Sequence, residues 1–294
     1  MNEKFHSSTS DIKIRSSDGI EFDLHRTLLE AYTGAFPGPE LDTGGEVLQL
    51  TETGNVLKIL FEFVYPQRHP DLEDKDFDLI AAVAEAVGKY EVYSAINTCN
   101  TRMRFFLPTR ATDIFVYAMK HDHPKLANEA IPYIVRAPLI PVLKKLPLCY
   151  LLPWTQHHEA WSSILKDARR AIKCMPSATQ HNLCHSGPAV CNTCRGSLYT
   201  WVTGLEELDT AFALKGALSL AKISNTGLSC CKTATLSNPT SSSAFSAPVL
   251  PHHSSAFSTP AMPIANVNTK CDHMVNLAKT CEDKVMAIPP FSKV

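Results

Sequence analysis

The sequence predicts an α+β fold in which a small sheet flanked by helices is followed by an all-helical extension and a disordered tail. Residues 11–24 alternate between apolar and polar side chains, which is typical of strands. From residue 56 onward, apolar residues recur with helical spacing instead. Residues 237–263 contain no Asp, Glu, Lys or Arg. A chain of 294 residues is long enough to bury a substantial core.

The predicted sheet begins with a β-hairpin. Two short alternating runs, 12–14 and 20–24, flank the sequence Ser-Ser-Asp-Gly at 16–19, whose residue types favour a turn. His25 and Arg26 then open an apolar helical step that contains Leu28 and Leu29. Residues 47–50, Val-Leu-Gln-Leu, predict one more short strand.

Helices are predicted from residue 51 onward. Thr51 or Thr53 can cap a helix whose apolar residues lie between 56 and 64. Asp74 or Asp76 can begin the next helix, and a further one includes residues 96–103. We expect residues 108–175 to be entirely helical, and one helix to span residues 198–220. Tryptophans at helical spacing are usually core residues, and this is the expectation for Trp154, Trp161 and Trp201.

Four separated motifs, in the right order, resemble a BTB/POZ domain over residues 11–105. An Asp opens the first strand, Phe-x-x-His-Arg-x-x-Leu closes the hairpin, Phe-x-Phe-Val-Tyr ends the central helix, and a Lys-Tyr pair lies in a later helix. The residues that carry the resemblance are Asp11, Phe22, His25, Arg26, Leu29, Phe61, Tyr65, Lys89 and Tyr90. The Tyr-Pro variant followed by His-Pro-Asp-Leu at 69–72 is similar to the BTB proteins of mushroom-forming fungi.

This resemblance and the changes in composition together predict six segments. They are a flexible N-terminus (1–10), the BTB/POZ domain (11–105), a helical extension (106–175), a cysteine-rich helical segment (176–235), a disordered Ser/Pro-rich linker (236–268) and a tail with a short helix (269–294). Because this tail is expected to bury little, removing everything after residue 235 should leave stability nearly unchanged.

Bulk properties exclude several functions. The 28 basic and 29 acidic residues give a net charge of -1 with no dense basic run, which argues against direct nucleic-acid binding. The sequence has neither a signal peptide nor an apolar run long enough to span a membrane, so we expect a cytoplasmic or nuclear protein. It also lacks the common catalytic motifs, so we do not expect an enzyme. An unrecognised catalytic site within 106–235 is the alternative.

The resemblance implies a protein-interaction module, and one use of this fold is as a substrate adaptor for a cullin-type ubiquitin ligase. The cullin-binding surface would then include residues 66–72 and the helices between 77 and 103. A nuclear transcriptional co-regulator that acts through protein contacts is the alternative. The partner can also be a second copy of the chain, although only ten residues precede Asp11, too few for the exchanged N-terminal extension of many BTB dimers.

Two readings remain open for Asp11 and His25. Either they shape a partner or dimer face, as the matching pair does in the family, or Asp11 caps the hairpin or helix start while His25 occupies a hydrogen-bonded structural position. We favour the structural reading, because a buried carboxylate is costly unless it is paired. No third group organises the two residues as an acid–base pair.

One cluster has the residue types of a metal site. His181, Cys184, Cys191 and Cys194 lie within fourteen residues and can close a tetrahedral zinc site, with Cys-x-x-Cys as the chelating pair. The alternative is a cysteine-rich helical cap with reduced thiols, because a structural zinc site usually joins two such pairs. No other cofactor is expected. His121 and His123 are interpreted as turn residues before Pro124.

Overall fold

The computed structural model describes residues 9–36, 47–179, 184, 187–219 and 271–291. The chain divides into two compact units, one made of residues 1–158 with 290–294 and the other of residues 159–289. This division falls inside a helix, at 158/159. The predicted linker, 236–268, and the predicted flexible N-terminus, up to residue 8, lie outside the described residues.

The first unit begins with the predicted hairpin. Strands β1 (Ile12–Arg15) and β2 (Glu21–Leu24) pair antiparallel with Ile14 opposite Phe22, so both side chains lie on the buried face. Gly19 closes the turn with a φ of +83°, a conformation that glycine adopts without strain. Strand β3 (Leu48–Gln49) pairs parallel to β1, and the described strands form a sheet of order β2-β1-β3. The small sheet is therefore confirmed.

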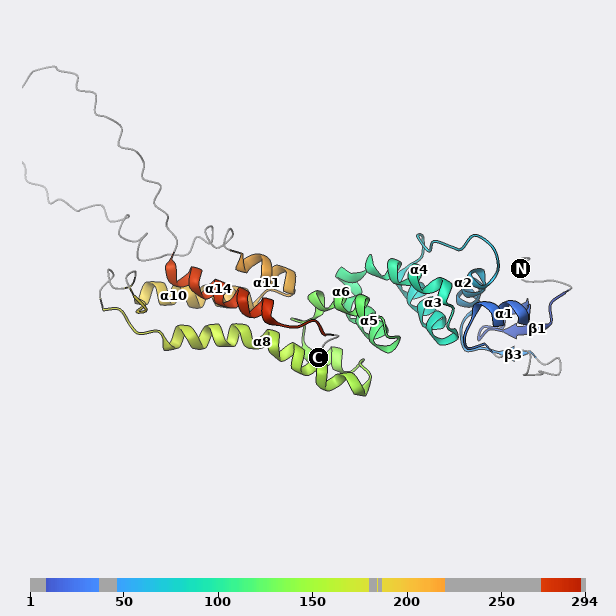
Figure 1. The fold of residues 1–294 in the computed structure, drawn as a ribbon, viewed down its shortest axis with the longest axis horizontal. Helices are drawn as coiled ribbons and strands as arrows, with labels where there is room; N and C mark the ends of the chain where they lie inside the picture. The colour runs from blue at the N-terminus through green and yellow to red at the C-terminus, as the bar shows by residue number, and fades with distance from the viewer. Residues whose placement is uncertain (1–8, 37–46, 180–183, 185–186, 220–270, 292–294) are drawn as a thin grey trace, which may run out of the picture. The chain divides into compact units, whose positions relative to one another are not determined.

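Four helices accompany the sheet (Figure 1). They are α1 (Arg26–Tyr32), α2 (Gly54–Val64), α3 (Phe77–Tyr90) and α4 (Tyr93–Arg104). Helix α1 lies between β2 and β3 in the chain, and the other three follow β3. Helix α2 packs against α3, and α3 packs against α4. Their apolar faces and the sheet enclose one core, whose fully buried members include Ile14, Phe22, Leu24, Leu29, Leu57, Leu60 and Phe61. Phe61 meets Phe22 edge-on, with ring centroids 5.3 Å apart.

The N-terminal cap of α2 differs from the prediction. Thr53 occupies the cap position, but its side chain makes no capping hydrogen bond. The backbone N–H of Gly54 donates instead to Asp18 Oδ1 at 2.8 Å, so a residue of the hairpin turn caps this helix. Helix α3 follows the prediction, because Asp76 accepts a hydrogen bond from the N–H of Leu79 at 2.8 Å.

The rest of the first unit is helical. It contains α5 (Leu107–Lys120), α6 (Pro124–Ile134), α7 (Leu139–Leu143), the 3-10 helix η2 (Leu148–Tyr150) and the start of α8 (Leu151–Cys174). Helices α5 and α6 pack together, and Trp154 of α8 is fully buried beside Phe115 of α5. Phe291, near the end of the chain, packs edge-on against both rings. The chain therefore returns to the first unit after completing the second.

The second unit contains the end of α8 together with α10 (Asn192–Glu206), α11 (Ala211–Leu218) and α14 (Asp272–Ala287). The single helix expected over 198–220 is wrong. Thr210 Oγ1 accepts a hydrogen bond from the N–H of Ala213 at 3.1 Å, and this cap starts a new helix. Trp161 and Trp201 are buried in this unit, as expected for core residues.

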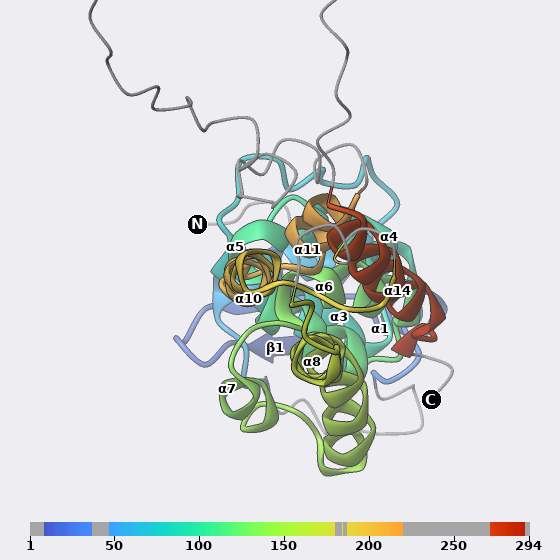
Figure 2. The same cartoon turned by 90° about the vertical axis from the view of Figure 1, so that its left-hand side faces the viewer.

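Helix α14 is longer and better packed than the sequence indicates. It lies beside α11 in both views (Figure 1 and Figure 2). Lys284 pairs with Asp167 of α8 at 2.6 Å. Its buried face consists of His273, Met274, Leu277, Ala278, Cys281 and Val285. The expectation that the tail buries little is therefore wrong, because helical periodicity in 272–287 places six residues on one buried face.

Candidate functional site

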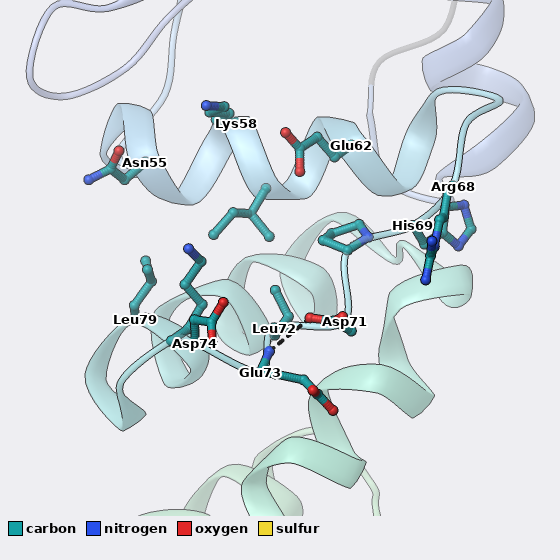
Figure 3. Close-up of a pocket in the computed structure, with 13 residues that line it drawn as sticks. Asn55, Lys58, Glu62, Arg68, His69, Asp71, Leu72, Glu73, Asp74 and Leu79 are labelled. Atoms are coloured by element: carbon teal, nitrogen blue, oxygen red, sulfur yellow. Dashed lines mark hydrogen bonds between the residues drawn. The ribbon is translucent and has the colours of Figure 1, made fainter.

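A groove on the first unit is the candidate interaction site (Figure 3). It is a cavity of about 500 Å³ bounded by α2, by the connection between α2 and α3, and by the first turn of α3. The lining residues are Asn55, Lys58, Ile59, Glu62, Arg68, His69, Pro70, Asp71, Leu72, Glu73, Asp74, Lys75 and Leu79. The groove includes residues 68–72, which belong to the cullin-binding surface that the BTB resemblance predicts.

The connection between α2 and α3, residues 66–75, is fastened to the helices beneath it. Leu72 has a φ of +61° and is 3% exposed, so its side chain anchors the middle of the connection in the core. Arg102 of α4 donates from Nε to the carbonyl of Asp71 at 3.0 Å and pairs with Glu73 at 3.2 Å. The ring of His69 packs against Phe63 at a centroid distance of 5.2 Å. One wall of the groove is therefore held in place by α2 and α4.

Charged side chains dominate the groove. Lys58 and Glu62 project from α2, one turn apart, and both line the groove (Figure 3). Along the connection, Arg68 and Lys75 flank the acidic residues Asp71, Glu73 and Asp74, and all five are exposed. Charges of both signs on a fixed frame favour a partner surface with a complementary pattern, which gives specificity and directs encounter.

The hairpin and helix signature residues form a structural network. Asp11 Oδ1 accepts a hydrogen bond from the N–H of Arg26 at 2.8 Å, so it caps the start of α1. Tyr65, at the end of α2, accepts from the backbone N–H of His25 at 3.2 Å and lies 3.0 Å from His25 Nδ1. His25 Nε2 lies 3.0 Å from Thr9 Oγ1. These contacts match the structural reading of Asp11 and His25.

The other signature residues are buried or paired. Phe22, Leu29 and Phe61 are fully buried in the core. Lys89 Nζ donates to Glu52 Oε1 at 2.8 Å, and the hydroxyl of Tyr90 donates to Glu52 Oε2 at 2.7 Å. The Lys-Tyr pair can be recognised from the sequence but Glu52 cannot, because nothing in the local pattern connects positions 37 and 38 residues apart.

The two histidines that flank Asp122 turn to different partners. His121 Nε2 lies 2.9 Å from Glu85 Oε2, whereas His123 Nε2 lies 3.2 Å from the hydroxyl of Tyr117. Burial lowers the pKa of His123, and the neighbouring His121 lowers it further. These separate partners agree with the interpretation of both histidines as turn residues.

Three of the four predicted metal ligands come together in the second unit. The sulfurs of Cys184, Cys191 and Cys194 all lie within 4.8 Å of one another, and all three residues are buried. This cluster can hold a metal ion. His181, the fourth predicted ligand, lies outside the described residues.

Comparisons with known proteins leave the chain without an assigned family. A comparison with protein-family models finds no match, and a comparison with curated proteins also finds none. Among the residues that the structure describes, no helix combines the length and apolar character needed to cross a bilayer.

Proposed function

We propose that this protein is an interaction module of the BTB type that recruits a cullin-type scaffold through the groove between α2 and residues 66–75. The proposal joins two independent lines of support. The sequence motifs resemble those of BTB domains, and the mixed unit contains a small sheet of order β2-β1-β3 with helices α1 to α4. The resemblance supplies the class of partner.

The observation that carries the proposal is the fastened connection itself. A binding surface gains affinity when its frame is fixed before the partner arrives, because less conformational entropy is then lost on association. Leu72 and Arg102 fix residues 71–73 in this way. The mixed charges around them suit a protein surface better than a compact apolar ligand, since small-molecule pockets are lined mainly by apolar side chains.

A direct binding measurement tests this proposal. The purified full-length chain is titrated with a purified cullin N-terminal domain in a calorimeter, and the variant Lys58→Glu/Lys75→Glu is compared with it. Both lysines line the groove. We expect the wild-type chain to bind and the variant to bind at least about tenfold more weakly, which corresponds to about 1.4 kcal/mol.

The matched control is Lys125→Glu, which reverses the same charge at an exposed position of α6 outside the groove. It should bind within about twofold of the wild type, because an exposed charge outside the binding surface contributes little to affinity. Circular dichroism of all three proteins verifies that they are folded. A wild-type chain that does not bind the cullin domain would refute the partner class, and equal weakening in the control would refute the groove as the site.

A further inference from the structure

The second unit contains a cluster of three cysteines that the proposed interaction function does not use. The sulfurs of Cys184, Cys191 and Cys194 lie within 4.8 Å of one another and are shielded from solvent. Four ligands around zinc at about 2.3 Å place tetrahedral sulfurs about 3.8 Å apart. The three sulfurs therefore need to approach one another by no more than about 1 Å to complete such a geometry.

The start of helix α10 positions two of these cysteines. Cys191 occupies the cap position of α10, and Cys194 follows within the first turn. The N-terminal end of a helix carries partial positive charge, which favours a negative sulfur there. In addition, the backbone N–H of Cys191 donates to the sulfur of Cys184 at 3.4 Å.

Hydrogen bonds join the two ends of the connection between α8 and α10, close to Cys191. The guanidinium of Arg195 donates to the carbonyls of Ile172 and Met175 at the end of α8, at 2.8 and 2.7 Å. The N–H of Val190 donates to the carbonyl of Pro176 at 2.8 Å. These bonds place Cys191 next to the end of α8 without relying on the cysteines themselves.

Helix α14 supports the third cysteine. His273 Nε2 donates to the carbonyl of Cys184 at 2.6 Å, and both residues are buried. Hydrogen bonds that orient the ligand-bearing segment are typical of metal centres and influence their affinity. This contact links the cluster to a helix that begins almost ninety residues further along the chain.

We propose that Cys184, Cys191 and Cys194 bind one structural zinc ion. Thiolate sulfur is a ligand that zinc prefers, and a buried site of this kind contributes to folding rather than to catalysis. Structural zinc takes four ligands, and the three cysteines supply three of them. The inference is independent of the groove on the first unit, so either proposal can fail without the other.

Metal analysis of the intact protein tests the site. The full-length chain is purified without chelators, and its metals are counted by mass spectrometry. We expect about one zinc per chain, and zinc–sulfur distances of about 2.3 Å by X-ray absorption. Cys191→Ser should lower the zinc content at least about tenfold, since losing a ligand costs more than losing an outer partner. Cys149→Ser, at an exposed cysteine, should leave it unchanged.

A second measurement needs no variant and covers the case in which Cys191→Ser does not fold. The native chain is alkylated with and without a strong zinc chelator, and modification is located by peptide mass spectrometry. The chelator should expose Cys184, Cys191 and Cys194 to alkylation, whereas exposed Cys149 and Cys174 should react equally in both conditions. Equal protection of the cluster with and without chelator, iron or copper in place of zinc, or a chain that takes up no zinc would overturn the proposal.

Discussion

At the scale of single residues, Glu52 is a largely buried carboxylate that is held by hydrogen bonds. Its side chain is 14% exposed and receives hydrogen bonds from both Lys89 and Tyr90. Burial opposes ionisation of this carboxyl, but the two hydrogen bonds outweigh it and hold the pKa below its ordinary value. Burial likewise raises the pKa of Tyr90 to about 12, so Tyr90 remains a donor at neutral pH.

Replacing Glu52 by Ala should therefore destabilise the first unit. The substitution leaves the hydroxyl of the buried Tyr90 without its acceptor, and we expect a loss of about 1–3 kcal/mol in the free energy of unfolding. Urea denaturation at pH 7 measures this loss. Glu30→Ala, at an exposed position of α1, should change stability by less than about 0.5 kcal/mol.

The same carboxyl predicts a pH dependence. Because its folded-state pKa is depressed, the ionised form stabilises the fold above the ordinary value of 4.5, and this contribution is lost as the pH falls through the folded-state pKa. The stability difference between wild type and Glu52→Ala should therefore be constant near neutrality and shrink below pH 4.5. A difference that stays constant down to acid unfolding would show that the charge of Glu52 contributes nothing.

Gly88 illustrates what residue-level sequence reasoning could not explain. A Cβ added here would lie 2.3 Å from Nδ1 of His121, so the glycine makes room for a ring that comes from α5–α6. The requirement arises from a tertiary contact 33 positions away, which no local pattern contains.

At the scale of elements, most helices and strands could be predicted because their signals are local. The hairpin follows from alternation and a turn sequence, and α3 follows from an Asp cap before an apolar stripe. The cap of α2 could not be predicted in this way, since its acceptor, Asp18, lies 36 residues before Gly54. The three clustered cysteines were found from spacing, whereas His273 was missed because it is 89 residues from Cys184.

Replacing Asp18 and Thr53 separately by alanine tests which of the two residues caps α2. Asp18→Ala should lower the melting temperature of the first unit by about 2–4 °C, since it removes the acceptor for the N–H of Gly54. Thr53→Ala should have almost no effect, because the Thr53 side chain makes no capping bond. Scanning calorimetry of the two variants measures the difference. A larger effect of Thr53→Ala than of Asp18→Ala would show that Thr53 caps the helix, as the sequence indicated.

At the scale of the whole molecule, the two compact units are each completed by a segment distant in sequence. Helix α14 supplies six buried residues to the second unit, and Phe291 supplies a ring to the first. The sequence predicted a helix in the tail but not its docking, since its partners are α11, Asp167 of α8 and Cys184.

Ending the chain at residue 235 should therefore destabilise the second unit. The truncation removes Met274, Leu277 and Val285, whose burial contributes about 1.5–3 kcal/mol each, so the unit should lose well over about 3 kcal/mol. Hydrogen exchange should become much faster in α10 and in residues 159–174 of α8.

The control is an internal deletion of residues 240–260 that keeps α14. A twofold change in the length of a chain connection changes its closure entropy by only about 0.6 kcal/mol, so exchange should remain slow. Unchanged exchange in the truncated chain would show that α14 contributes nothing to the unit.

The packing of Phe291 also has a consequence for biosynthesis. Phe115, Trp154 and His157 all precede the second unit in the chain, whereas the ring that covers them follows it. A growing polypeptide on the ribosome must emerge past residue 291 before these aromatic groups meet their final neighbour. Until that moment, the apolar surface formed by these aromatic side chains is exposed on the nascent chain. We therefore expect chaperones to bind the chain late in translation.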